Sequence, residues 1–166
     1  ASALANAQCS PQEQAKFIAS DATAGDDFGI RVDLSGDTAI VGAYADDHAG
    51  GIDAGSAYVF VRSSGIWTEQ AKLIASDAAA GDFFGLAVAI AGDTAVIGAR
   101  QDDHAAGTDA GSAYVFVRTG GIWTQQAKLI ASDAVANDNF GWSVALSGDT
   151  IVVGSFQDDN AGGTDA

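Results

Sequence analysis

A repeat of 56 residues constrains the fold of this chain more than any other feature of its sequence. Phe28, Phe84 and Phe140 open near-identical units and stand 56 residues apart (84 − 28 and 140 − 84), as do Trp67 and Trp123. A repeat of this kind is one supersecondary unit, and it buries its apolar face only by stacking on its neighbours. We therefore expect a stack of like units.

Each unit contains short runs of β-branched, aromatic and small apolar residues. The runs span residues 28–35, 38–43, 56–62 and 66–76 in the first unit, 84–91, 94–99, 112–118 and 122–132 in the second, and 140–147 and 150–155 in the third. A Gly-Asp pair between the first two runs fits a two-residue hairpin turn. Four short antiparallel strands in a repeat of about 50 residues are typical of a β-propeller blade. The sequence predicts an all-β fold of about three blades of four antiparallel strands, with about ten to twelve strands in total.

The first run of the second unit is apolar on one face and carries Ala87, Ala89 and Ala91 on the other. Because both faces suit burial, we expect an inner strand packed between neighbouring blades. The large aromatic residues of the repeat are expected to pack in the core rather than to form a platform for sugars. They are represented by Phe84, Tyr114 and Trp123.

The charge of the chain excludes several partners. Its formal net charge is −15, from 22 acidic and 7 basic residues. Affinity for nucleic acid comes mainly from Lys and Arg, so neither nucleic acid nor an anionic membrane is an expected partner. No apolar run is long enough to span a membrane, so no membrane insertion is expected. Cys9 is the only cysteine, which leaves no disulfide within the chain.

The segment 1–13 differs from the repeats that occupy residues 14–166. Ala5-Asn6-Ala7 resembles a signal-peptidase site, which would make the chain an exported protein. The alternatives are an ordinary mature segment and a strand swapped into another copy of the chain.

The repeat resembles the FG-GAP family, whose members are the blades of integrin-α-type propellers. Phe-Gly opens each unit, and residues 41–43, 97–99 and 153–155 stand where the family has Gly-Ala-Pro. Ser-Ala-Tyr-Val-Phe stands at the aromatic third strand, and the short Gly-Asp turn is closest to the bacterial subgroup. The resemblance covers residues 14–166. It implies a secreted or cell-surface propeller of bacterial type that acts in adhesion or assembly without catalysis.

Two features depart from the family pattern. The Pro of Gly-Ala-Pro is absent in all three units. The integrin-type calcium loop between the first two strands is also missing, because Gly-Asp-Thr leaves no room for it. A family calcium site is therefore not expected at that position.

An acidic loop after the second strand is the strongest candidate for a calcium site. Carboxylates and loop carbonyls are the oxygen ligands that Ca²⁺ takes, and Ca²⁺ is the one cofactor expected here. The alternative is that the same Asp residues form Asx turns and solvated loops. The candidate ligands are Asp46, Asp47, Asp53, Asp102, Asp103, Asp109, Asp158, Asp159 and Asp165. A weaker candidate set, in the links between units, is Asp21, Asp26, Asp27, Asp77, Asp82, Asp133 and Asp138.

His48 and His104 share one repeat position, and Asn160 takes that position in the third unit. A general base is normally unique and paired with a nucleophile, so a residue that recurs in each blade is expected to be a loop hydrogen-bonder. The repeats are also too alike to supply the distinctive polar site of an enzyme. No enzymatic activity is expected.

Two classes of function stay open. One is a non-catalytic interaction or adhesion module that binds a protein or a glycan through its loops. The other is a structural subunit that assembles head to tail into a ring or a fibre, because propellers close with four to eight blades and three blades leave two faces exposed. Such a homo-oligomer would form through blade faces and strand complementation. The alternative is that the chain is part of a longer protein.

Overall fold

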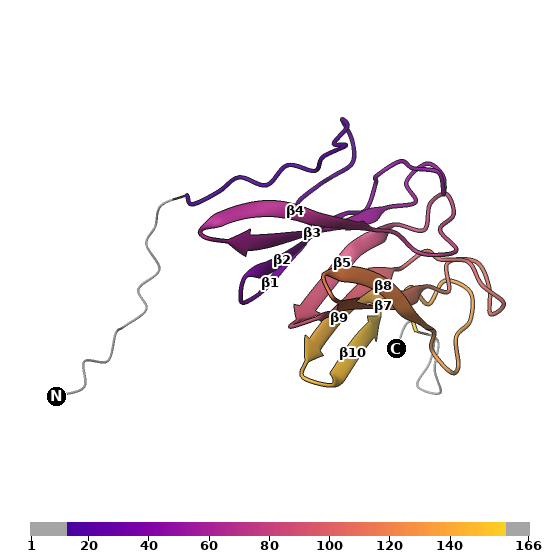
Figure 1. Cartoon of the computed structure of the whole chain (residues 1–166). Helices are drawn as coiled ribbons and strands as arrows, with labels where there is room; N and C mark the ends of the chain where they lie inside the picture. Colours follow the sequence, from indigo (N-terminus) through magenta and orange to yellow (C-terminus); the bar gives the residue numbers. More distant parts are fainter. Residues whose placement is uncertain (1–12, 159–166) are drawn as a thin grey trace.

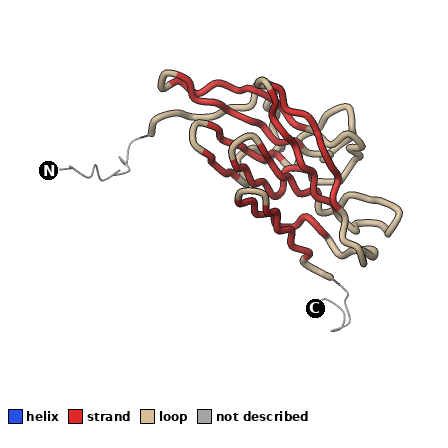
Figure 2. Tube along the Cα trace, turned by 60° about the horizontal axis from the view of Figure 1, so that its bottom comes forward, coloured by secondary structure: helices blue, strands red, loops and turns tan. Residues whose placement is uncertain are grey.

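The computed structural model describes residues 13–158 and places ten antiparallel strands in three sheets, with no helix in that part of the chain (Figures 1 and 2). The first sheet has the order β1-β2-β3-β4, the second β5-β6-β7-β8, and the third pairs β9 with β10. The strands are β1 (Val32–Ser35), β2 (Thr38–Ala43), β3 (Ser56–Ser63), β4 (Ile66–Leu73), β5 (Phe84–Ala91), β6 (Thr94–Ala99), β7 (Ser112–Thr119), β8 (Ile122–Leu129), β9 (Phe140–Ser147) and β10 (Thr150–Ser155). We call the sheets the first, second and third blades. The predicted all-β repeat is confirmed.

The predicted hairpins are confirmed at the ends of the strands. Ser35 pairs with Thr38 across the two-residue loop, and Gly36 has a φ of 59°. A glycine with positive φ at the first central position is what a primed hairpin turn requires. The equivalent turns of the second and third blades have the same form, since Gly92 and Gly148 have φ values of 58° and 55°.

Several strand boundaries differ from the predicted runs, and the third strands end one residue later than predicted, at Ser63 and Thr119. The fourth strands end at Leu73 and Leu129 rather than at residues 76 and 132, because the third strands that pair with them begin nearby and offer no further partner. The first strand of the first blade begins at Val32 rather than at residue 28. In the second blade the same residues form strand, where Phe84 pairs with Ala99 of its own blade and donates its N–H to Ala54 of the preceding blade at 3.1 Å.

The blades pack face to face, and their first strands lie side by side (Figure 1). The largest core cluster lies between the first two blades and includes Ile40 and Val59 on one side and Ile90 on the other. Burial therefore depends on position in the stack. Val88 and Ile90 of the central blade are 9% and 4% exposed, whereas their equivalents in the first blade, Val32 and Leu34, are 67% and 60% exposed. The inner-strand prediction is confirmed for the central blade.

Adjacent blades meet through glycines. A Cβ on Gly42 would lie 2.0 Å from the carbonyl oxygen of Gly85, and one on Gly98 would lie 2.0 Å from that of Gly141. Gly85 in turn would place a Cβ 2.2 Å from the carbonyl oxygen of Ser56. The Gly of Phe-Gly in one blade therefore lies against the Gly of Val-Gly-Ala in the blade before it. Phe-Gly and Val-Gly-Ala, the two parts of the repeat signature, therefore each contribute a glycine to one backbone contact between blades.

This contact predicts different costs for the same substitution at Gly29 and Gly85. The two glycines share a repeat position and have φ values of 96° and 95°, but only Gly85 faces a neighbouring blade. We expect Gly29→Ala to cost about 1–2 kcal/mol through its positive φ. Gly85→Ala adds the overlap with Ser56 and should cost at least about 2 kcal/mol more. Urea unfolding measures both, and equal costs would contradict the proposed role of the contact.

Candidate functional site

The two ends of the blades differ in character. The tight hairpins lie at one end, which we call the hairpin end. The long loops 44–55 and 100–111 lie at the other, together with the linkers 74–83 and 130–139 that lead to the next blade (Figure 1). We call this the loop end. Each long loop is fastened to the linker that follows it, since the N–H groups of Gly81 and Phe83 donate to the carbonyls of Ile52 and Asp53 at 2.9 and 3.2 Å.

A partly buried polar network holds the loop end of the first blade. Lys72 of β4 lies 2.8 Å from Asp46 of the long loop and 2.6 Å from Asp21 of the preceding linker. The hydroxyl of Tyr58 lies within hydrogen-bond distance of both carboxylates, and Ser56 donates to Asp46. Because burying a charge without a partner is costly, this cluster is stable only as a complete set.

The second blade repeats the network with an inter-blade contact. Lys128 of β8 lies 2.7 Å from both Asp102 and Asp77, and the hydroxyl of Tyr114 lies 2.9 Å from each of them. Asp77 follows β4 of the first blade, so this ion pair fastens the linker of one blade to the outer strand of the next. Burial acts to raise the pKa of Asp77, but the hydrogen bonds from Lys128 and Tyr114 outweigh it and lower that pKa.

The Asp residues predicted as calcium ligands take separate structural positions. Asp46 and Asp102 belong to the buried networks, while Asp47 and Asp103 accept the backbone N–H of the loop residue six positions later at 2.8 Å. Within residues 13–158, no three acidic, His or Cys side chains are grouped as a metal site would need. Asp159 and Asp165 lie outside the described residues. Calcium binding by these loops stays a prediction.

His48 and His104 close their loops. In His48, Nδ1 accepts the N–H of Gly50 at 3.0 Å and Nε2 lies 3.0 Å from the carbonyl oxygen of Gly55. Because Nδ1 accepts, Nε2 carries the proton and donates to the carbonyl. His104 contacts Ala106 and Gly111 in the same way. Both His residues are loop hydrogen-bonders, as predicted, and Asn160 lies outside the described residues.

A buried carboxylate caps each linker. Asp26, Asp82 and Asp138 each accept the N–H of the residue three positions before them, at 2.6 to 2.7 Å. Burial raises the pKa of Asp82 to about 6. Since this value lies above that of the unfolded chain, Asp82 disfavours the folded state as the pH rises from about 4 to about 6. Asp133, the remaining linker acid of the third unit, is exposed.

The cap of the third linker is incomplete. Among the buried side-chain atoms of the described residues, only Oδ1 of Asp138 has no hydrogen-bond partner. In the first linker the same oxygen of Asp26 accepts the hydroxyl of Thr23 at 2.6 Å. Val135 takes the place of Thr23 in the third linker and has no hydroxyl to donate. Oδ1 of Asp138 therefore lacks the hydroxyl donor that Thr23 supplies to Asp26.

We expect Val135→Thr to stabilise the protein by about 1 kcal/mol, because its hydroxyl would donate to Asp138 as Thr23 donates to Asp26. Val135→Ala, which supplies no donor, is the matched control. Thermal or urea unfolding checks the pair. A Thr variant no more stable than the Ala variant would show that Oδ1 of Asp138 already has a partner in solution.

Positions that differ among the repeats gather at the loop end. Five repeat positions carry a different residue in each of the three copies. They are 23/79/135 (Thr, Ala, Val), 27/83/139 (Asp, Phe, Asn), 30/86/142 (Ile, Leu, Trp), 31/87/143 (Arg, Ala, Ser) and 44/100/156 (Tyr, Arg, Phe). All five lie in the linkers, at the start of the first strand or directly after the second. The strands therefore have nearly the same sequence in each blade, whereas the side chains at the loop end differ from blade to blade.

Five of these side chains form one contiguous row. The ring of Phe83 lies 5.4 Å from that of Tyr44, and the guanidinium of Arg100 lies 5.1 Å from the ring of Phe83 and 5.0 Å from that of Trp142. Trp142 stacks on Phe156 at 4.7 Å. We call Tyr44, Phe83, Arg100, Trp142 and Phe156 the variable cluster. No sequence motif marks this cluster, and the signal for it is the difference among the repeats at these positions.

Comparison with known proteins agrees with the repeat and its fold. The sequence profile of the FG-GAP repeat matches residues 11–60, 67–116 and 123–166, three segments that begin 56 residues apart (67 − 11 and 123 − 67). No curated protein matches the chain. The profile covers most of the sequence, and the described sheets have the strand order of propeller blades. The chain therefore belongs to the FG-GAP repeat family.

Proposed function

We propose that the chain is a non-catalytic interaction module that works outside the cell or on its surface and binds its partner through the loop end of the blades. The observation that carries this proposal is the variable cluster, because it lies where copies of one framework have diverged. Residues kept for packing repeat from blade to blade. Residues selected by a partner have no reason to repeat, since each one meets a different part of that partner.

The composition of the cluster fits an interaction surface. Trp, Tyr and Arg are the residues enriched among the side chains that dominate protein interfaces. Trp142 and Phe156 are 40% and 60% exposed, so the row offers apolar surface to a partner. The extracellular location rests on the FG-GAP resemblance and the signal-like segment at residues 5–7. No helix of the described residues is long and apolar enough to cross a bilayer.

Retention of the labelled protein on intact cells of its source organism tests this proposal. We expect saturable binding that falls at least about tenfold when Tyr44, Trp142 and Phe156 are all changed to Ser, because such residues dominate interface energies. The matched control changes Ile66 and Ile122 to Ser, which removes comparably exposed apolar side chains from the hairpin end. Running the assay with Ca²⁺ and with EDTA shows whether the predicted calcium sites take part. Absent saturable binding, or an equal loss in both variants, would contradict the proposal.

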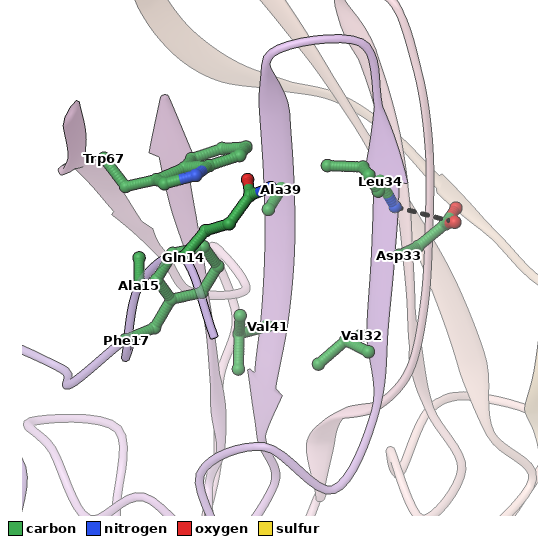
Figure 3. A pocket seen from close by; sticks show the side chains of 9 residues that line it. All are labelled: Gln14, Ala15, Phe17, Val32, Asp33, Leu34, Ala39, Val41 and Trp67. Carbon is green, nitrogen blue, oxygen red and sulfur yellow. Dashed lines mark hydrogen bonds between the residues drawn. The ribbon is translucent and has the colours of Figure 1, made fainter. Parts of the chain in front are cut away.

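A second candidate function, self-assembly, is favoured by the open face of the first blade. A hollow of about 510 Å³ lies on this face, with Gln14, Phe17 and Trp67 on one side and Val32 and Leu34 on the other (Figure 3). The third blade also has an open side, where Val152 is 61% exposed. Its equivalents in the first and second blades, Ile40 and Val96, are fully buried.

The repeat shows what would fill the hollow. In the second blade the equivalents of Val32 and Leu34 are Val88 and Ile90, which pack against Ile40 of the first blade. The residue on the third blade that corresponds to Ile40 is Val152. A second copy of the chain could therefore dock its third blade on the first blade of its neighbour, as successive blades dock within one chain. A contact of this heterologous kind builds rings or fibres.

The mass of the native species tests self-assembly. If two faces of this kind meet, changing Val32 and Leu34 to Ser should shift the chain toward monomer, because burial of each side chain contributes about 1.5–3 kcal/mol. The control is Ile66→Ser, a residue that is 67% exposed like Val32 but lies at the hairpin end. Analytical ultracentrifugation reports the outcome. A monodisperse wild-type monomer at micromolar concentration would contradict this second function.

A further inference from the structure

The cationic side chains of this acidic chain are distributed unevenly. The chain has 7 Lys and Arg residues against 22 acids. Four of the seven form ion pairs, namely Arg62, Lys72, Arg118 and Lys128. Within residues 13–158 the other three, Lys16, Arg31 and Arg100, make no ion pair. In a chain of net charge −15, two arginines without a carboxylate partner need a reason.

Both of these arginines line the same cavity at the loop end. It has a volume of about 180 Å³ and is lined by Ile30, Arg31, Tyr44, Leu86, Arg100 and Trp142. A second hollow of about 160 Å³ lies on another side of Arg31 and Trp142, above Ala87. All three blades contribute to the first cavity, and Arg31 of the first blade and Trp142 of the third both border it. This arrangement depends on the positions that differ among the repeats.

Arg100 is held in place without being neutralised. Its guanidinium lies between the rings of Phe83 and Trp142, at 5.1 and 5.0 Å. One Nη1–H donates to the amide oxygen of Asn139 at 3.3 Å. These contacts fix the plane of the group through neutral partners, so its charge is left for a ligand. Arg31 donates to the carbonyl of Ile30 at 2.9 Å and is otherwise exposed.

No acid of the described residues forms an ion pair with Arg31 or Arg100. Hydrogen bonding to Asp27 together with burial raises the pKa of Tyr44, and the negative charge of Asp53 acts in the same direction. Asp109 accepts from the side chain of Gln101 at 3.1 Å. The chain therefore keeps two guanidinium groups at the cavity without supplying a carboxylate to either one.

We propose that this cavity binds a carboxylate side chain, Asp or Glu, of an acidic segment in a partner protein. The planar fork of Arg matches a carboxylate in a bidentate pair, and the aromatic walls shield that pair from water. A protein is favoured over a glycan because Trp, Tyr and Arg together are typical of protein interface centres. At physiological salt the net negative charge of the chain is screened beyond about 8 Å, so the local guanidinium groups decide the contact.

The proposal rests on the proposed function, since it names the ligand of the same loop end. Its test is therefore independent of cells. The probe is a fluorescein-labelled hexapeptide with two central Glu residues, and the control peptide carries Gln in their place. Fluorescence anisotropy at physiological salt compares the wild-type chain with Arg31→Gln, Arg100→Gln and Lys16→Gln. Lys16 is the matched control because it is an exposed cation without an ion pair and is absent from the cavity lining.

We expect the Glu peptide to bind at least about tenfold more tightly than the Gln peptide, the factor that one charge-assisted hydrogen bond supplies. Arg31→Gln and Arg100→Gln should each lose that preference, whereas Lys16→Gln keeps it. Circular dichroism and unfolding midpoints confirm that the variants are folded. Arg31→Gln serves as the second variant because Arg31 is exposed and supports no other side chain.

Three outcomes would overturn the proposal. The first is equal affinity for the Glu and Gln peptides, and the second is a loss in Lys16→Gln as large as in Arg100→Gln. The third is binding of an oligogalacturonate through the same arginines without binding of the Glu peptide, which would identify an acidic glycan instead. If the peptide fails while loop-end variants still lose cell retention, only the ligand class is wrong. If cell retention also shows no dependence on the loop end, the proposed function fails with it.

Discussion

The close backbone contact between neighbouring blades is the constraint on which the remaining structure depends. Gly42 and Gly85 approach so closely that neither position has room for a Cβ, and Gly98 and Gly141 repeat the contact at the next joint. This approach brings Phe84 into the core between two sheets, where it is fully buried. It also explains why the repeat is marked by Phe-Gly and Val-Gly-Ala rather than by larger apolar residues. One glycine pair sets the spacing at which each apolar face meets the next.

The polar network of the loop end completes what the glycines begin. The glycine contact fixes the distance between sheets, and the linker after the first blade reaches the core only through small residues such as Ala75 and Ala78. Lys72 and Lys128 supply polar anchors, because each lysine joins a long loop to the linker that precedes its own blade. A buried ion pair contributes little net stability, yet removal of one partner is costly. The network therefore determines where the loops lie more than how stable the blades are.

The sequence predicted the framework well and the site poorly, for one physical reason. Strands, hairpins and blade packing follow from local patterns that recur in each copy, so periodicity alone identified them. The network joins Asp21 to Lys72 and Asp77 to Lys128, residues that are distant in the sequence and come together only after the linker has crossed to the next blade. Tyr114 was correctly predicted to pack, but its hydroxyl belongs to the network. Periodicity also failed at residues 28–31, which form no strand although the equivalent residues 84–87 do.

The difference between repeated and individual positions links this framework to function. The three blades share the glycines of Phe-Gly and Val-Gly-Ala and a buried aspartate in each linker, and the first two blades share the third strand, so the scaffold tolerates change only where side chains leave the packed layers. The start of the first strand and the residue after the second meet that condition, and Ile30, Leu86 and Trp142 differ there while Phe28, Phe84 and Phe140 do not. A row such as Tyr44, Phe83, Arg100 and Trp142 forms because adjacent blades place equivalent positions side by side. The repeated blades thus place equivalent positions next to one another on a continuous surface. The residues that differ at these positions determine which side chains that surface offers to a partner.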